Sequence, residues 1–133
     1  MNKMQHMVYG IGNPLIDIIV SVDEQDVIDL GIHKGTMALI GRERMEELLQ
    51  LSKNRKTTYS CGGSCPNTII ALASLGVPAT LAGKIGNDEN GTIYRNRLVS
   101  LGVQDELVTT DKEMTGSTVI LITPDSERSM NTF

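Results

Sequence analysis

A predicted helix between two predicted strands constrains the fold of this chain more than any other feature. Residues 65–75 place apolar side chains around most of a helix, which we expect to be largely buried, with Ser64 as its N-cap and Gly76 and Pro78 after its end. An extended run precedes this helix, and residues 79–85 form an apolar run after it. The order strand, helix, strand is typical of a right-handed parallel crossover, so the pattern predicts an α/β fold.

The other segments continue this alternation between strand and helix periods. Within the 133 residues, the turn sequence "PDSE" separates two alternating segments near the end of the chain and predicts a β-hairpin. This length fits one domain or part of one. We expect further strands at residues 7–12, 15–22, 36–40, 116–123 and 128–133, and further helices at 23–30, 42–52 and 92–101.

The predicted strand at 15–22 has two different faces. One face carries only the apolar residues Ile16, Ile18, Val20 and Val22, whereas the other face includes Asp17. The carboxylate of Asp17 is therefore expected on a mixed face, where it could accept hydrogen bonds.

Composition and charge exclude several classes of function. The net charge of −4, with scattered lysines and arginines, provides no basic stripe for nucleic acid, and no segment resembles a signal peptide or a membrane span. Cys61 and Cys65 lack the second pair or nearby histidine of a zinc set, so we expect free thiols in a reducing cytoplasm. His6 and His33 are expected in exposed loops. No metal site is predicted.

The stretch "CGGSCPN" at residues 61–67 contains more glycine than a helix start needs. Because Gly62 and Gly63 are surplus to capping, we expect something to approach this backbone closely. The known phosphate motifs do not explain the surplus. No lysine follows, as a P-loop requires, and Gly10 and Gly12 lack the third glycine of a dinucleotide fingerprint.

These observations leave a neutral, hydrogen-bonding pocket as the prediction for this junction. Asn67 offers a donor and an acceptor, and Asp17 offers an acceptor, which together suit the vicinal hydroxyls of a ribose or another sugar. The alternative is that both side chains only satisfy nearby backbone groups, and spacing alone does not decide between the two readings.

Three motifs in the chain resemble the PfkB-type (ribokinase-like) family of carbohydrate and nucleoside kinases. They are "GIGNPLID" near the start, "CGGSCPNTIIALASLGVPATLAGKIGNDENG" in the middle and "TGSTVILITPDSERSMNT" near the end. The middle motif resembles the N-terminal signature of that family. The first and last look most similar to the adenosine-kinase branch and to neighbouring bacterial sugar kinases. The order of the motifs fits, and together they cover nearly the whole chain.

The resemblance implies a Rossmann-like core of parallel sheet and flanking helices, with a small β-sheet lid. Residues 1–133 would form the N-terminal part of one kinase domain, with core segments at about 7–12 and 57–110 and lid strands at about 15–22, 36–40 and 116–133. The implied activity is ATP-dependent phosphorylation of a primary hydroxyl on a nucleoside or sugar. Dimerisation of two copies through their lids is a further expectation.

Carried over position by position, the resemblance also implies residues that bind the substrate. Asn13 and Asp17 match positions that hold the substrate in the adenosine-kinase branch, with Asp17 on the ribose-type hydroxyls. The positions that bind the sugar ring are matched by Gly62, Gly63 and Asn67.

Four further residues match lid or phosphate positions of the family. Met37, Leu39 and Met130 match lid positions that cover the base or the apolar face of the ligand, and Arg128 matches an arginine near the transferred phosphate. Each has a simpler alternative, because the methionines could be core residues and Arg128 an exposed hairpin charge.

The chain departs from the family in lacking its second, glycine-rich signature. That signature supplies the catalytic aspartate and the anion hole, and it would lie beyond Phe133, as would the sites for ATP and Mg²⁺. We therefore expect no catalytic base within this chain and little turnover by the chain alone. The alternative is a stand-alone module that binds a ligand or dimerises without catalysis.

Overall fold

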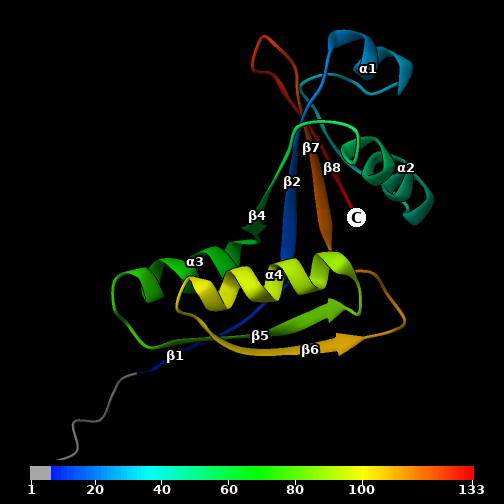
Figure 1. Ribbon diagram of the computed structural model, residues 1–133. Helices are drawn as coiled ribbons and strands as arrows, with labels where there is room; N and C mark the ends of the chain where they lie inside the picture. Colours follow the sequence, from blue (N-terminus) through cyan, green and yellow to red (C-terminus); the bar gives the residue numbers. More distant parts are fainter. Residues whose placement is uncertain (1–6) are drawn as a thin grey trace, which may run out of the picture. The chain divides into compact units, whose positions relative to one another are not determined.

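The computed structural model describes residues 7–133, so His6 lies outside the described residues. His33 is exposed, and none of the described helices is long and apolar enough to cross a membrane. Strands and helices alternate along much of the chain (Figure 1). In chain order the elements are β1 (Val8–Ile11), β2 (Leu15–Ser21), α1 (Glu24–Asp29), β3 (Met37–Leu39), α2 (Arg42–Ser52), β4 (Thr57–Gly62), α3 (Ser64–Ser74), β5 (Ala79–Gly86), α4 (Glu89–Ser100), β6 (Gln104–Thr110), β7 (Ser117–Ile122) and β8 (Arg128–Thr132).

The chain divides into two compact units, each made of separate stretches of sequence. The first, called here the parallel unit, comprises residues up to Ile16 and Cys61–Gly116. The second, called the mixed unit, comprises Asp17–Ser60 and Ser117–Phe133. The α/β fold expected from the sequence is thereby confirmed.

The parallel unit is built on a three-stranded parallel sheet in the order β1, β5, β6. Helices α3 and α4 lie on one side of this sheet (Figure 1). Gly10 of β1 faces α3, because a Cβ atom there would lie 2.6 Å from Ile69. The alternate residues Tyr9 and Ile11 are exposed on the other side, where the Tyr9 hydroxyl donates to Glu106 over 2.6 Å.

The mixed unit is built on a five-stranded sheet in the order β3, β8, β7, β2, β4. Strands β7 and β8 form the antiparallel hairpin predicted from "PDSE", and β3 pairs in parallel with β8. The three segments expected as lid strands all lie in this sheet; that they act as a lid stays a prediction. One face of the sheet and the helices α1 and α2 supply a core that includes Ile18, Val20, Val27, Met45, Leu48, Val119 and Leu121.

Two strands differ from the sequence-based expectation. Strand β4 lies at the edge of the five-stranded sheet, whereas the sequence assigned residues 57–110 to the α/β core. Its polar sequence TTYSCG is mostly exposed, which suits an edge strand better than a parallel sheet covered on both faces. Strand β6, whose sequence QDELVTT is also polar, was not predicted as a separate strand.

Two helices also differ in their starts or their burial. Helix α3 begins at Ser64 with Gly63 as its N-cap, so the prediction of Ser64 as the cap was wrong. The helix is less buried than expected, with Pro66 and Ile69 buried and Leu75 79% exposed, because the sheet covers only one of its sides. Helix α4 begins at Glu89, three residues before the expected start, because Asp88 caps it.

Candidate functional site

The predicted site residues fall into two groups, one in each unit. The parallel unit holds Asn13, Gly62, Gly63 and Asn67. The mixed unit holds Asp17, Met37, Leu39, Arg128 and Met130.

The junction between β4 and α3 explains why Gly63 must be glycine. Gly63 has φ +100°, a backbone conformation that disfavours residues with a Cβ atom. A Cβ atom there would also lie 2.5 Å from the backbone oxygen of Asn13. The close approach expected from the sequence is therefore made by the chain's own backbone, and the conformation alone does not require a ligand at Gly63.

The same junction presents polar groups that the fold does not use. Asn67 is exposed, and within residues 7–133 its side-chain amide makes no hydrogen bond, while its backbone amide closes the first helical turn onto Gly63. Asn13 is exposed as well. Gly62 is buried, and its carbonyl accepts from the Tyr94 hydroxyl over 3.3 Å. The reading that Asn67 serves nearby backbone finds no support, and its role in binding stays a prediction.

Asp17 lies on the face of β2 opposite the core. Burial alternates strictly along this strand, with Ile16, Ile18 and Val20 buried and Asp17 and Ile19 half-buried. Desolvation by burial raises the pKa of Asp17 above its ordinary value of 3.8, and no charged neighbour among the described residues offsets it. A half-buried carboxylate without a protein partner can accept hydrogen bonds from a ligand.

The strand registers bring the predicted apolar residues onto one face of the five-stranded sheet, which we call the open face. Met37 pairs with Met130, which pairs with Ile120 across the hairpin, so the three side chains form a row. Leu39 pairs with Thr132 in the next row. Met37 is 71% exposed and Leu39 87% exposed, so the alternative reading of Met37 as a core residue is not supported.

Asp17 belongs to this open face too. The buried residues of β2 and β7 share the core face, so Asp17 and Ile19 project from the same side as Ile120. Backbone bonds from Ile16 to Gly116 and from Val22 to Ile122 show that β2 and β7 run in step. A carboxylate thus lies beside an apolar row on one surface.

Arg128 stands at the hairpin end of the open face. It begins β8, pairs with Ile122 and is exposed. Among the described residues it makes no ion pair, so its guanidinium group is available to an anion. Whether it contacts a phosphate stays a prediction.

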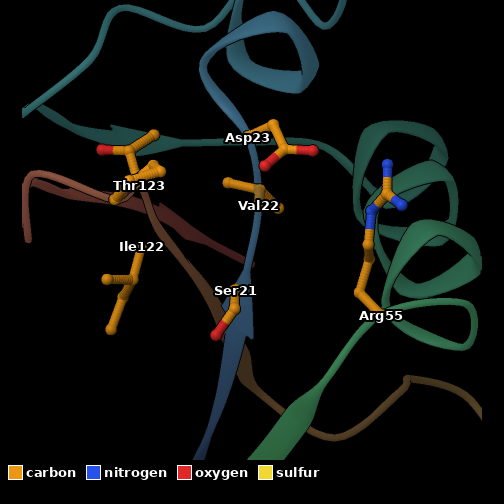
Figure 2. Close-up of a pocket in the computed structure, with 7 residues that line it drawn as sticks. Ser21, Val22, Asp23, Arg55, Ile122 and Thr123 are labelled. Carbon is orange, nitrogen blue, oxygen red and sulfur yellow. The ribbon is translucent and has the colours of Figure 1, made fainter.

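A cavity that sequence analysis did not find lies at the ends of β2 and β7 in the mixed unit (Figure 2). Its volume is about 290 Å³, and its lining residues are Ser21, Val22, Asp23, Arg55, Ile122, Thr123 and Pro124. The cation in this wall is already paired, because Arg55 donates to Asp26 over 2.6 Å. No motif could have predicted this cavity, because its walls come from segments far apart in the sequence.

Acidic, histidine and cysteine side chains do not converge into a candidate metal centre. Within residues 7–133, no group of three or more of them is placed to hold a metal ion. Mg²⁺ usually binds through one or two carboxylates together with substrate phosphates, so the position of a Mg²⁺ site stays a prediction. Neither Cys61 nor Cys65 forms a disulfide within the described residues, and both are half-buried.

Comparison with known proteins supports the reading of these motifs. Adenosine kinase 2 of Arabidopsis thaliana is 26% identical over 124 residues, which cover 91% of this chain and 36% of the relative. The chain also resembles a probable sugar kinase from Rhizobium etli CFN 42, with a TM-score of 0.75 and 33% identity over 97% of this chain and 39% of that one. Adenosine kinase from Schistosoma mansoni, solved in complex with adenosine, gives a TM-score of 0.77 and 28% identity over 95% of this chain and 37% of that one.

The chain therefore spans less than half the length of these proteins. Residues 34–133 match the family described as pfkB family carbohydrate kinase, which is most of the chain. The chain belongs to the pfkB family of carbohydrate kinases.

Proposed function

We propose that this chain forms the acceptor-binding part of a kinase that transfers phosphate from ATP to a primary hydroxyl of a nucleoside or sugar. The observation that carries the proposal is the open face, where the unpaired carboxylate of Asp17 lies beside the row formed by Ile120, Met130 and Met37. A carboxylate can hold vicinal hydroxyls, and an apolar row can cover the flat or apolar part of the same ligand.

This combination favours a nucleoside over a simple sugar. A monosaccharide carries hydroxyls around its ring and would leave the exposed Met37 and Leu39 without an apolar partner. A nucleoside has both a polar ribose and an apolar base face. The Schistosoma mansoni relative binds adenosine, which supports the same class of ligand.

The described residues supply binding groups rather than a complete reaction centre. Among them no group of three or more acidic, histidine or cysteine side chains is placed to hold a metal ion, and no carboxylate is assigned as the catalytic base. Phosphoryl transfer depends on positioning together with charge stabilisation of the transferred group. We expect ATP, Mg²⁺ and the base to be held by other residues of a longer polypeptide, and the 133-residue chain alone to turn over little substrate.

A coupled assay of ADP release tests the proposal. The 133-residue chain and the longest polypeptide encoded by its reading frame are assayed with adenosine, ribose and fructose. We expect turnover by the longer polypeptide, with the highest kcat/KM for adenosine, and background rates for the short chain. Absence of turnover by the longer polypeptide with every acceptor would contradict the proposed function. Robust turnover by the short chain would show that it contains a base that we have not identified.

The exposed open face favours a second candidate function, which is dimerisation. Met37 and Leu39 are the most exposed apolar residues of the mixed sheet, and such a face is a candidate for self-association. We expect Leu39→Glu to shift a dimer toward monomer in sedimentation velocity. A wild-type chain that is monomeric at all concentrations tested would exclude this candidate.

A further inference from the structure

The residues of "GNDENG" at the start of α4 converge on one buried side chain, Thr115. The Asp88 carboxylate accepts from the Thr115 backbone amide over 2.8 Å and from the Thr115 hydroxyl over 2.7 Å. The Thr115 hydroxyl in turn accepts from the Gly86 amide over 2.9 Å. Asp88 also caps the helix by accepting from the Gly91 amide over 2.7 Å. We call this network the Asp88 clasp.

The two glycines of the motif are explained by the same network. A Cβ atom on Gly86 would lie 2.6 Å from the Thr115 nitrogen and 2.7 Å from the Asp88 carboxylate. A Cβ atom on Gly91 would lie 2.3 Å from the Gly86 oxygen and 2.8 Å from the Thr115 hydroxyl. Because both glycines make room for the clasp, the motif is accounted for without a phosphate at this helix start.

Thr115 lies at the point where the chain leaves the parallel unit. It is 1% exposed, and the unit boundary follows directly after Gly116. The next element is β7, which pairs with β8 and so carries Met130 and Arg128 through the hairpin. The clasp therefore holds Thr115, two residues before the hairpin that bears predicted substrate contacts.

Helix α4 also holds the end of β4, where the chain enters the parallel unit. Strand β4 enters the parallel unit at Cys61, and the Tyr94 hydroxyl of α4 donates to the carbonyl of Gly62. Tyr94 is fully buried. Gly62 and Thr115, which both lie close to a unit boundary, are thus hydrogen-bonded to α4 or to its N-cap.

We propose that Asp88 is a positioning residue, which holds Thr115 and thereby the start of β7 for binding of the phosphate acceptor. The inference rests on the proposed kinase function. It assigns Asp88 no contact with substrate, ATP or metal. An ordinary helix cap needs one acceptor oxygen, whereas the position of Thr115 requires both oxygens of the carboxylate.

Three substitutions separate positioning from capping. Asp88→Ser keeps a good N-cap but offers one short oxygen, so it can cap α4 and cannot also hold both groups of Thr115. Thr115→Val keeps the size and removes the hydroxyl, which leaves the cap bond to Gly91 intact. Thr115→Ser retains the hydroxyl and is the conservative control.

Two measurements then decide the inference. Hydrogen exchange on the 133-residue chain reports the Thr115 amide directly, and we expect exchange roughly tenfold faster in Asp88→Ser, with Thr115→Ser close to wild type. Steady-state kinetics on the longer polypeptide should show KM for adenosine raised roughly tenfold in Asp88→Ser and Thr115→Val, with KM for ATP unchanged.

Each outcome bears on one part of the inference. Unchanged exchange at Thr115 in Asp88→Ser would overturn the clasp. Faster exchange with an unchanged KM for adenosine would overturn the positioning role, because it would show only a loss of local stability. A wild-type polypeptide without any kinase activity would overturn the proposed function and the positioning role, while the exchange result would still decide the clasp.

Discussion

Two glycine-rich junctions, each joining a strand to a helix, use the same backbone device and differ at the helix start. Between β4 and α3, Gly63 lies against the backbone oxygen of Asn13. In the first turn of α4, after β5, Gly91 lies against the backbone oxygen of Gly86. Helix α4 is then capped by the Asp88 side chain, whereas α3 begins at Ser64 with Gly63 as its N-cap and no side-chain cap.

The two junctions differ in the polar groups that they leave available to a ligand. In both, glycine is required by an oxygen of the chain itself, so glycine alone does not identify a binding site. The start of α4 is occupied by Asp88 and Thr115, while the start of α3 keeps the unused amide of Asn67. We therefore propose the α3 junction as the one that contacts substrate. The Asp88 network holds Thr115 at the α4 junction, where a cavity of about 140 Å³ is lined by residues that include Gly86, Gly91 and Thr92.

The largest expected effect is that of adding a Cβ atom at Gly63. Gly63→Ala should lower the free energy of unfolding by about 3 kcal/mol, because it combines a positive φ with a backbone clash. Gly76→Ala is the matched control, since Gly76 has φ +82° and a Cβ atom added there would have no neighbour within 4 Å. We expect that control to cost about 1 kcal/mol. Equal losses in urea denaturation would contradict the clash with Asn13.

The next effect is that of Asp17→Asn, which should weaken substrate binding and slightly stabilise the folded state. Asp17→Asn should weaken binding of adenosine roughly 10- to 100-fold in calorimetry on the longer polypeptide, because a charged acceptor is lost. Asp29→Asn, on the exposed surface of α1, serves as the control. Wild-type affinity in folded Asp17→Asn would remove Asp17 from the site.

The raised pKa of Asp17 fixes the sign of its effect on stability. Burial penalises the ionised form, so above the folded pKa the carboxylate destabilises the folded state, and this cost disappears as pH falls through that pKa toward 3.8. Asp17→Asn should therefore be slightly more stable than wild type at neutral pH, with the difference shrinking in acid. Substrate binding should weaken over the same acidic range.

A smaller effect on adenosine binding is expected at Asn67, for which the equivalent residue of the other junction is the control. Asn67 and Thr92 are each the fourth residue of their helix, and both are exposed. Asn67→Ala should weaken adenosine binding roughly 3- to 10-fold, as expected for a neutral hydrogen bond. Thr92→Ala should leave binding unchanged, because its hydroxyl only donates to the Asp88 carbonyl. Equal effects of the two variants would remove the distinction between the junctions.

The smallest expected effect is on thermal stability and concerns the ion pair between Lys34 and Asp125, away from both junctions. The hydrogen bond from Lys34 lowers the pKa of Asp125 to about 2, and Lys34 also pairs with Glu24. A lowered folded pKa means that this contribution to stability is present above pH 3.8 and is lost as pH falls toward 2. Asp125→Asn should lower Tm slightly at neutral pH and not in strong acid. High salt should reduce the difference, since the groups are exposed.

The sequence predicted those elements whose pattern of apolar, polar and turn residues lies within one continuous segment. Helix α2 has the predicted bounds Arg42–Ser52, because its apolar spacing and its polar face lie within one segment. The hairpin followed from its turn residues, and the two faces of β2 followed from its period of two. The surplus glycines correctly indicated a close approach at Gly63.

What sequence did not predict depends on distant partners. The oxygen that approaches Gly63 belongs to Asn13, far along the chain, and residue types alone cannot name it. The same holds for the sheet that β4 joins, the partners of Asp88 and the cavity near Arg55. The hydrogen bonds of Asp88 in "GNDENG" go to Thr115, and no sequence pattern links the two.

The strand order of the mixed sheet also has a consequence for biosynthesis. Strand β2 lies between β4 and β7, and β7 and β8 are the last of the described strands to leave the ribosome. Until they emerge, β2 has β4 as its neighbour on one side and an unpaired edge on the other. Pairing between such distant strands is slow to form. The nascent chain therefore carries an aggregation-prone edge until the β7–β8 hairpin has been synthesised and pairs with β2.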